Sequence, residues 1–327
     1  MLIYEKLMLN ILEDLKKNKL QKVAGDASSR NFYRVNIKNK NYILIHCKKE
    51  KKINLERYAA INSLLIKNKL LAPKLIQLNL KSNCMLIEDF GDVSYKNILD
   101  KKTNQFKYYK KIVDVLLKIQ LIKINLKSKK VIKNTYAKTI LMKESNLFFK
   151  WYAPKKIAKS KIKKFAQESK KELSNIFHRI EGANKFFVHR DFHVSNLMSY
   201  KKKVGIIDSQ DALLGNVAYD ILSLIDDVRI KTSIKLKKQI LHYYILRAKK
   251  VLSISPAIFQ DDFDILSVQR SLKIIGIFTR LHARDGKKQY LSLIPYAWSL
   301  MHLRLQNPIF GVFNKILNYY LPKKRRK

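Results

Sequence analysis

The stretch that decides the fold reads His189-Arg190-Asp191-Phe192-His193-Val194-Ser195-Asn196, and it is followed by the apolar run Val204-Gly205-Ile206-Ile207, which ends in Asp208. An Asp, then an Asn, then a second Asp at the end of an apolar strand is typical of phosphoryl transfer, in which a protein orients a hydroxyl and holds Mg²⁺ against ATP. Residues 197–200 and 204–207 predict a hairpin around a polar turn. Asn196 and Asp208 should therefore lie at the same end of that hairpin.

Each residue of this pattern has its own expected role. Asp191 would accept the proton of the attacking hydroxyl as the catalytic base. Asn196 and Asp208 would bind the metal, because Mg²⁺ is a hard cation that prefers oxygen ligands. His189 or His193 alone is more often a structural histidine, but the ordered pattern on elements of the expected type favours catalysis. The expected cofactors are ATP and Mg²⁺.

Hydrophobic periodicity divides the chain into two regions. Residues 1–19 have apolar side chains at helical spacing, and a second helix is expected at 55–69. Short alternating or apolar runs predict five strands, at residues 22–24, 32–37, 41–47, 74–78 and 84–89. Beyond residue 93 the pattern is helical except for the hairpin after Asp191. We therefore expect a nucleotide-binding lobe at 1–91, a hinge near Gly91 and a helical lobe at 92–327 that carries the catalytic loop and the acceptor site.

A serine-rich loop in the first region is the candidate phosphate contact. It reads Gly25-Asp26-Ala27-Ser28-Ser29-Arg30 and joins two expected strands. Such a turn can present N–H groups and hydroxyls to phosphate oxygens, with Arg30 supplying charge, although the same residues also suit an ordinary hairpin turn. Gly25, Ser28, Ser29 and Arg30 are the expected contacts. Where the last strand leaves this region, the main chain at Glu88 and Phe90 is expected to bind the adenine edge.

Composition excludes several classes of protein. The hydrophobic share of 47% is that of a folded chain, and no run reaches about eighteen apolar residues, so no membrane span is expected. The amphipathic start lacks the pattern of a secretory signal. Cys47 and Cys84 share no metal-ligand spacing and are too few for a disulfide framework. We expect a cytoplasmic protein, and its oligomeric state is not encoded in any feature of the sequence.

The formal net charge of +43 suggests nucleic acid as a partner, but its pattern does not. Lysines greatly outnumber arginines and occur in every segment, whereas Arg clusters and aromatic stacking runs are missing. No specific nucleic-acid binding is expected. Asp191, Asn196 and Asp208 together also argue against a catalytically idle basic fold that binds a partner. The terminal residues 323–327 are interpreted as a disordered, solubilising basic tail.

Several further segments carry a family resemblance over nearly the whole length. Besides the catalytic stretch, they are residues 25–30, 86–92, 146–152, 207–212, 219–224 and 268–278. With them the chain resembles the superfamily of aminoglycoside phosphotransferases and choline kinases, and within it the bacterial N-acetylmuramate/N-acetylglucosamine anomeric kinases of cell-wall recycling. The resemblance implies an α+β, two-lobed protein-kinase-like fold with a small antiparallel-sheet N-lobe and an α-rich C-lobe.

The resemblance also implies an activity: ATP-dependent phosphorylation of the anomeric C1 hydroxyl of N-acetylmuramate or N-acetylglucosamine, a small-molecule sugar substrate, in peptidoglycan recycling. It assigns Asp191 as base, Asn196 and Asp208 as metal ligands, and Asp220 as a buried carboxylate that braces the catalytic loop. Glu144 and Trp151 lie in the segment expected to close over the sugar. Trp151 could equally be a core residue and Glu144 part of a solvated helix face.

Two positions depart from the pattern of protein-kinase relatives. The lysine that usually holds phosphates from the third strand is replaced by Ile45, with Lys48 and Lys49 just beyond, and the residue that takes over its role is not identified. Ser209 replaces an aromatic residue after the second metal ligand. An alternative function is a kinase of the same fold for another hydroxyl compound, such as an aminoglycoside, choline or a different sugar. The basic character of residues 93–180 suits an anionic sugar better than a cationic antibiotic.

Overall fold

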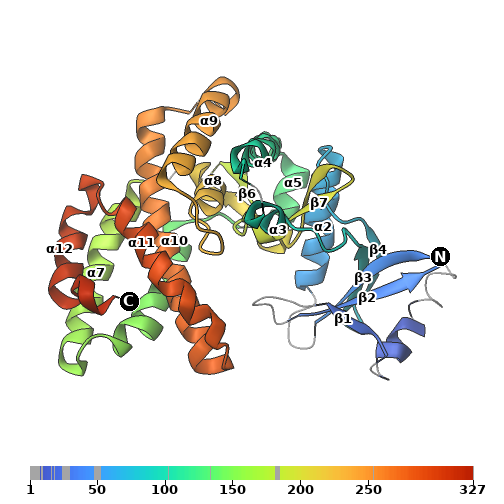
Figure 1. The fold of residues 1–327 in the computed structure, drawn as a ribbon, viewed down its shortest axis with the longest axis horizontal. Coiled ribbons are helices and arrows are strands. Elements are labelled where there is room, and N and C mark those ends of the chain that lie inside the picture. The colour runs from blue at the N-terminus through green and yellow to red at the C-terminus, as the bar shows by residue number, and fades with distance from the viewer. Residues whose placement is uncertain are drawn as a thin grey trace. The chain divides into compact units, whose positions relative to one another are not determined.

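The computed structural model describes residues 8–326 except 9, 16, 18, 24–29, 48–52, 102, 133, 181–184 and 253, and of residues 53 and 127 it describes the main chain only. The chain forms two compact units, whose elements are drawn in Figure 1. The first unit comprises Met1–Lys101, Asn125–Ile132 and Ser195–Ala212, and the second comprises Lys102–Ile124, Lys133–Val194 and Leu213–Lys327. The hairpin after Asp191 thus clusters with the first unit. A domain division at residues 91/92 stays a prediction.

A five-stranded antiparallel sheet is the main feature of the first unit. Its strand order is β1-β2-β3-β5-β4. The bounds are β1 (Gln21–Val23), β2 (Asn31–Ile37), β3 (Lys40–His46), β4 (Leu75–Asn79) and β5 (Cys84–Glu88). All five expected strands are confirmed, with ends that differ by at most one residue. Lys38 and Asn39 join β2 to β3 with φ of 49° and 60°, as a two-residue type I′ turn requires.

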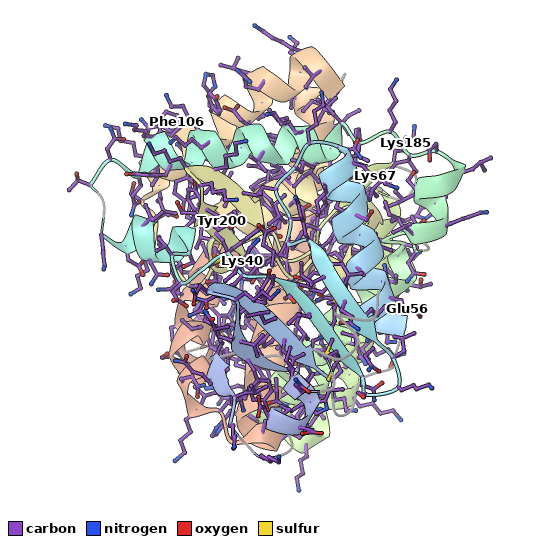
Figure 2. The ribbon with its side chains drawn as sticks, turned by 90° about the vertical axis from the view of Figure 1, so that its right-hand side faces the viewer. Lys40, Glu56, Lys67, Phe106, Lys185 and Tyr200 are labelled. Atoms are coloured by element: carbon purple, nitrogen blue, oxygen red, sulfur yellow. The ribbon has the colours of Figure 1, made fainter. Side chains whose placement is uncertain are left out.

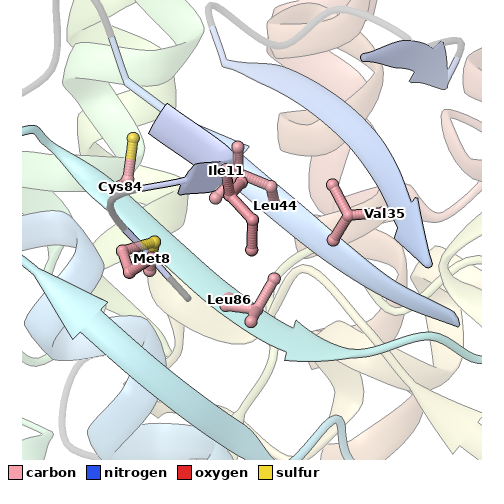
Figure 3. Packing of buried hydrophobic residues seen from close by; sticks show 6 residues of the cluster. All are labelled: Met8, Ile11, Val35, Leu44, Cys84 and Leu86. Atoms are coloured by element: carbon pink, nitrogen blue, oxygen red, sulfur yellow. The ribbon is translucent and has the colours of Figure 1, made fainter. Parts of the chain in front are cut away.

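Both faces of this sheet are buried. Neighbouring residues on one strand point to opposite faces, so the same strands contribute side chains to both buried clusters. Leu44 and Leu86 are paired across β3 and β5, and they pack with Met8 and Ile11 from the N-terminal segment (Figure 3). The next pair along the two strands, Ile45 and Met85, belongs to a second cluster on helix α2 (Ile53–Lys67). That second cluster is completed by Cys47, Leu55, Tyr58 and Ile87.

The predicted hairpin is present as β7 (Leu197–Tyr200) and β8 (Lys203–Ile206). Bridges Leu71↔Gly205 and Ser94↔Met198 attach it to the rest of the first unit. A side chain at Gly205 would collide with the ring of Phe90, because a Cβ there would lie 2.7 Å from two ring carbons. The first unit also contains α3 (Tyr95–Asp100), which Ser94 caps, α5 (Leu126–Val131) and the 3₁₀ turn η4 (Ser209–Asp211).

Helices dominate the second unit. They are α4 (Gln105–Gln120), α6 (Lys138–Leu147), α7 (Lys159–His178), α8 (Ala218–Ile225), α9 (Ile234–Leu252), α10 (Pro256–Asp285), α11 (Ile294–Arg304) and α12 (Gly311–Tyr320). A π-helical turn, η1 (Phe148–Tyr152), continues α6. Shorter turns are η2 (Ala153–Lys155), η5 (Lys288–Leu293), η6 (Pro308–Phe310) and η7 (Lys323–Arg325).

One expectation about this region is wrong. Besides the predicted hairpin, the region beyond residue 93 also contains a two-stranded sheet, in which β6 (Phe186–Val188) pairs with β9 (Leu213–Gly215). Each strand has three residues and the partners lie far apart in the sequence. Such strands leave no periodic signal, because alternation needs at least four residues to be recognised.

Helix α10 is the central packing element of the second unit and contacts α6, η1, α8 and α11. At Gly276 its backbone lies directly against the turn where α6 passes into η1. A Cβ at Gly276 would lie 2.3 Å from the carbonyl carbon of Leu147 and 2.5 Å from the nitrogen of Phe148. Only glycine permits this close approach of two main chains.

The interpretation of residues 323–327 as a disordered tail is wrong for the part that the structure describes. Lys323–Arg325 form a 3₁₀ turn, and Arg326 is 1% exposed. The Arg326 guanidinium lies 5.3 Å from the Trp298 ring centroid and donates to the Leu321 carbonyl at 2.7 Å. The Arg326 carbonyl in turn accepts from the Tyr152 hydroxyl at 2.6 Å. Burial of one arginine among aromatic and polar partners holds this segment in place.

Most of the positive charge lies at the surface. Lys40, Lys67 and Lys185 are examples of exposed lysines, and Figure 2 labels them among the side chains of the molecule. Among the described residues, no helix is both long enough and apolar enough to cross a membrane.

Candidate active site

In the second unit, Asp220 holds the start of the catalytic loop. Its two carboxylate oxygens accept hydrogen bonds from the main-chain amides of His189, at 2.7 Å, and Arg190, at 3.0 Å. Arg190 has φ of 73°, a left-handed conformation that is uncommon for residues other than glycine. Burial raises the pKa of Asp220 to about 7, against the effect of these two hydrogen bonds. Asp220 therefore fixes the backbone on the N-terminal side of Asp191.

Asp191 lies in a strongly cationic environment. Burial alone would raise its pKa, but Lys273, Arg190 and Arg270 hold it well below its usual range. His193 adds no positive charge at neutral pH, because burial and Arg229 lower its pKa to about 3. Asp191 is therefore ionised. A carboxylate of low pKa orients a hydroxyl by accepting its hydrogen bond, and takes the proton only as the new bond to phosphorus forms.

The other end of the loop is held by Asp227. Its carboxylate accepts from the amide of Val194 at 3.3 Å and from the amide of Arg229 at 3.0 Å. The Arg229 guanidinium also lies 3.3 Å from it. Burial would raise the pKa of Asp227, but Arg229 and the hydrogen bonds keep it below the usual range. This residue is thus a buried, charged anchor for the segment that follows Asp191.

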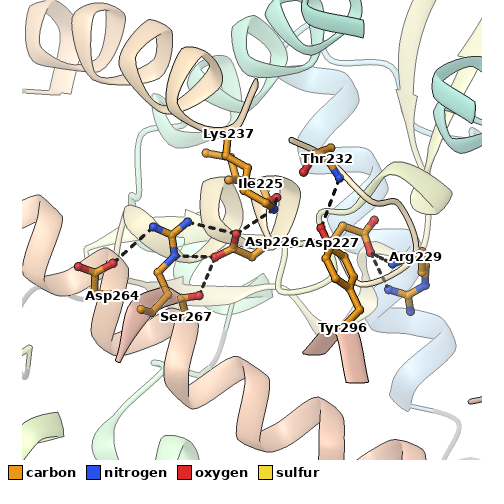
Figure 4. A network of polar contacts seen from close by, with 10 residues as sticks. Ile225, Asp226, Asp227, Arg229, Thr232, Lys237, Asp264, Ser267 and Tyr296 are labelled. Atoms are coloured by element: carbon orange, nitrogen blue, oxygen red, sulfur yellow. Dashed lines mark hydrogen bonds and ion pairs between the residues drawn. The ribbon is translucent and has the colours of Figure 1, made fainter. Parts of the chain in front are cut away.

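The neighbouring Asp226 anchors three helices at the same place (Figure 4). It is paired with Lys237 of α9 at 3.2 Å and with Arg304 of α11 at 2.9 Å. Ser267 of α10 donates a further hydrogen bond at 2.8 Å. The two adjacent carboxylates therefore have different roles: Asp226 binds three helices, and Asp227 binds the catalytic loop.

Glu144 lies in a buried polar cluster on α6. Its carboxylate contacts the Arg190 guanidinium and the Tyr136 hydroxyl, and it lies 3.0 Å from Lys273 Nζ. Gln269 donates to it at 3.2 Å. Burial would raise the pKa of Glu144, but Lys273 and Arg190 hold it below the usual range. The alternative of a solvated helix face is therefore wrong for Glu144.

Trp151 lies in the π-helical turn η1 and is half-buried, so it is not a residue of the closed core. Lys150 Nζ lies 5.8 Å from the centroid of the Trp151 ring. π-Helical turns are frequent at functional sites. A contact of Trp151 or Glu144 with a sugar stays a prediction.

In the first unit, the hairpin brings the two expected metal ligands together. The main-chain carbonyl of Asn196 accepts from the amide of Ile207 at 3.1 Å, so Asn196 lies beside the residue that precedes Asp208. Asp208 has φ of 63° and its side chain is 39% exposed. A carboxylate and an amide oxygen are a donor set that suits Mg²⁺. Among the described residues no group of three His, Cys, Asp or Glu could hold a metal alone, so phosphate oxygens and water would have to complete the shell.

Helix α2 supports the strained turn at Asp208. The Tyr58 hydroxyl accepts from the Asp208 amide at 3.3 Å, and Asn62, one helical turn later, accepts from the Ser209 hydroxyl at 2.7 Å. Arg57 donates to the Ala212 carbonyl at 2.5 Å. Burial, together with Asp208, raises the pKa of Tyr58 to about 12. Ser209 is fully buried, and its hydroxyl replaces the packing of an aromatic side chain with a hydrogen bond to α2.

The expected nucleotide contacts are only partly described. Gly25, Ser28 and Ser29 lie outside the described residues, whereas Arg30 is buried beside Asp208. The side chains of Glu88 and Phe90 both contact the hairpin at Tyr200, Glu88 by accepting a hydrogen bond at 3.2 Å and Phe90 by ring stacking at 4.6 Å. Any contact of theirs with adenine would therefore come from the main chain. These assignments stay predictions.

Several residues of the site were missed in the sequence. Lys273 is a charged residue within an apolar helical run, a pattern that could have signalled a buried partner. Arg34 makes a hydrogen-bonded ion pair with Asp89 at 2.6 Å and a second with Asp92 at 2.9 Å, which fixes the segment around Gly91. Tyr58 and Asn62 carried no signal, because polar side chains on a helix are normally solvated.

A profile described as the phosphotransferase enzyme family matches residues 19–252. The chain belongs to this family. Two curated members named N-acetylmuramate/N-acetylglucosamine kinase are similar to it. The protein of Neisseria meningitidis is 24% identical over 275 residues, which cover 83% of this chain and 81% of the relative. That of Pseudomonas aeruginosa is 26% identical, with coverages of 83% and 79%.

Solved structures of phosphotransferases share the fold. The gentamicin complex of aminoglycoside phosphotransferase APH(2'')-IIa superposes with a TM-score of 0.64 at 16% identity, covering 89% of this chain and 97% of that one. Ethanolamine kinase of Plasmodium vivax gives a TM-score of 0.62 at 14% identity, with coverages of 90% and 84%. The expected kinase-like α+β fold is thereby confirmed. Phosphotransferases of this fold have been solved with ADP, and one, an amicoumacin kinase, with AMP-PNP and Ca²⁺.

Proposed function

We propose that this phosphotransferase transfers the γ-phosphoryl group of ATP to the anomeric C1 hydroxyl of N-acetylmuramate, N-acetylglucosamine or both. The observation that carries the proposal is the loop around Asp191, which Asp220 and Asp227 hold from both sides in a chain of this family. The sugar class is supported by curated relatives of that name, which match over about four-fifths of their own length.

The residues divide the chemistry between them. Asp191 orients the C1 hydroxyl and receives its proton. Asn196 and Asp208 would hold Mg²⁺, which supplies positive charge against the phosphate oxygens. Lys273 and Arg190 keep Asp191 ionised, so that it can accept the hydroxyl hydrogen bond in the ground state.

Charge favours an amino sugar over a cationic antibiotic. A positively charged acceptor would need free carboxylates, but the carboxylate of Glu144 is already neutralised by Arg190 and Lys273. Lysines also outnumber acidic residues in the helical region, which suits the lactyl carboxylate of N-acetylmuramate. We infer use in peptidoglycan recycling. A cytoplasmic location is consistent with consumption of ATP and with two free cysteines, Cys47 and Cys84.

A substrate panel tests the proposal. The protein is incubated with ATP, Mg²⁺ and each of N-acetylmuramate, N-acetylglucosamine, their 1-O-methyl glycosides, choline and an aminoglycoside, and ADP release is measured. Phosphorus NMR then locates the phosphate. The free sugars should be consumed, their product should be labile to mild acid as anomeric phosphates are, and the methyl glycosides should be inert because C1 carries no hydroxyl. Phosphorylation at C6, or turnover of a methyl glycoside, would contradict anomeric specificity.

A further inference from the structure

A buried arginine of helix α10 lacks the partners that a buried guanidinium normally has. Arg270 is 5% exposed, and within the part of the chain that the structure describes it makes no hydrogen bond and no ion pair. Burial of a guanidinium is unfavourable unless anions or hydrogen-bond acceptors compensate it. Its five N–H donors need such acceptors. A buried cation of this kind indicates a site for an anion that the chain itself does not supply.

Other cations around the catalytic loop do have carboxylate partners. Lys273 Nζ lies 3.0 Å from the carboxylate of Glu144. The guanidinium of Arg229 lies 3.3 Å from the carboxylate of Asp227. Arg270 makes no equivalent pair with any described residue, so its charge differs from theirs in being available to a ligand.

Neighbouring residues of α10 place Arg270 on the side of the helix that supports the loop. Three residues earlier, Ser267 donates to Asp226 (Figure 4), and three residues later Lys273 lies against Glu144. Residues three apart on a helix are neighbours on its surface. The side chains of Lys273 and Glu144 are 14% and 11% exposed, so solvent reaches this part of the second unit.

Electrostatic coupling connects Arg270 to the catalytic base. Burial would raise the pKa of Asp191, whereas Lys273 and, less strongly, Arg270 lower it. Asp191, Lys273 and Arg270 all belong to the second unit, whereas the expected metal and nucleotide contacts belong to the first. The hydroxyl that Asp191 orients comes from the acceptor. An anionic group held at Arg270 is therefore most simply a group of the acceptor.

We propose that Arg270 binds the lactyl carboxylate of N-acetylmuramate and thereby favours this sugar over N-acetylglucosamine, an inference that rests on the proposed function. The lactyl ether is the group that distinguishes the two sugars, since N-acetylglucosamine has a hydroxyl in its place. A guanidinium matches a carboxylate with two parallel hydrogen bonds. The bound carboxylate would supply the anionic partner that Arg270 lacks.

The test compares three acceptors that differ at this one group. They are N-acetylmuramate, its lactyl amide, which has a similar shape and no charge, and N-acetylglucosamine. kcat/KM is measured for each acceptor, with saturating ATP and Mg²⁺, in the parent, Arg270→Met and Arg270→Lys. Arg270→Met should lower kcat/KM for N-acetylmuramate by about tenfold to a hundredfold relative to the two neutral acceptors, through loss of charge-assisted hydrogen bonds. Arg270→Lys should lose less, because it keeps the charge.

The ratio between acceptors separates substrate binding from other roles of Arg270. A change in the pKa of Asp191 affects all three acceptors alike and cancels in the ratio. Equal losses for the three acceptors in Arg270→Met would overturn the proposal, because they would indicate a contact with the transferred phosphoryl group or a purely structural role. Arg284→Met removes an exposed charge from the same helix and should leave every ratio unchanged.

Thermal unfolding without ligand controls for folding. If Arg270→Met does not fold, Arg270→Lys decides, and a parental ratio in that variant would overturn bidentate binding of the carboxylate. A parent that phosphorylates none of the three acceptors would contradict the proposed function and, with it, this inference. A parent that phosphorylates them, with ratios that Arg270 variants leave unchanged, would contradict the role of Arg270 alone.

Discussion

The carboxylate of Asp227 accepts a hydrogen bond from the main-chain amide of Val194, three residues beyond Asp191. Asp227 is fully buried and its charge faces Arg229. The Asp191 segment is thus fixed from the C-terminal side by one carboxylate and from the N-terminal side by Asp220. Two buried acidic residues outside the catalytic sequence hold the loop in its conformation.

Asp227→Asn should therefore lower turnover by about tenfold, while the KM for ATP changes little, because misplacement of the loop affects the transition state more than nucleotide binding. Stability should fall by about 1–3 kcal/mol, since the buried Arg229 pair loses its charge. Steady-state kinetics and urea unfolding measure the two effects. Asp261→Asn, which changes an exposed carboxylate on α10, is the control. Equal turnover in Asp227→Asn and parent would show that the loop needs no anchor there.

Asp191→Asn should reduce turnover by at least about a hundredfold, because the amide cannot accept the proton of the hydroxyl. ADP affinity should remain close to that of the parent. Single-turnover kinetics and calorimetry distinguish chemistry from binding. Near-parental turnover in this variant would mean that another group is the base.

The dependence of stability on pH should reflect two buried groups with opposite signs. The pKa of His193 is lowered from 6.5 to about 3, so its contribution to stability is present above pH 6.5 and is lost as the pH falls toward 3. The pKa of Asp220 is raised from 3.8 to about 7, so its contribution is present below pH 3.8 and is lost as the pH rises through 7. Between pH 3.8 and pH 6.5, where both groups change protonation on unfolding, the two slopes offset each other.

Single variants should separate the slopes. His193→Asn leaves Asp220 unopposed, so the free energy of unfolding should fall with rising pH relative to the parent. Asp220→Asn should do the reverse. Each change in slope is at most about 1.4 kcal/mol per pH unit. Urea unfolding at about pH 5 and about pH 6.5 measures it. Slopes that shift in the same direction in both variants would contradict the assigned pKa directions.

Arg326→Ala should destabilise the protein by about 2–4 kcal/mol, because it empties a buried site beside Trp298 and leaves the Leu321 carbonyl and the Asn318 side chain without their donor. Thermal or urea unfolding measures the loss. Lys324→Ala, two residues earlier and exposed, should have no measurable effect. A loss of similar size in both variants would point to an effect of net charge instead.

Nucleic-acid affinity should be weak, should fall steeply with salt and should not depend on sequence, since the lysines are solvated surface groups. Fluorescence anisotropy with several oligonucleotides over a salt series tests this. Binding that persists at physiological salt with a clear sequence preference would assign the charge a specific role.

The structural features that the sequence predicted are those that a local sequence pattern determines. The five strands, the hairpin and the placement of Asn196 beside Asp208 follow from apolar runs and turn residues close together in the chain. The short pair β6 and β9 could not be predicted, because its partners meet only in the folded protein. Burial of Arg326 likewise depends on Tyr152 and Trp298, which belong to distant segments.

The candidate site shows the same limit. Asp191, Asn196 and Asp208 were predicted as site residues from their order along the chain, whereas Lys273, Tyr58 and Asp227 act through contacts with residues far away in sequence. Contacts of this kind can be recognised only in the folded protein. Glu144 was predicted as a site residue, but the two cations that neutralise it were not predicted.

Gly276 lies where helix α10 meets the passage from α6 into the π-helical turn. No side chain fits between the two backbones there, so even alanine would have to push the turn that carries Trp151 away from the helix. In a saturation-mutagenesis library this position should tolerate nothing but glycine. Random drift or directed evolution toward new acceptors would have to alter the side chains around this contact and leave the contact itself unchanged.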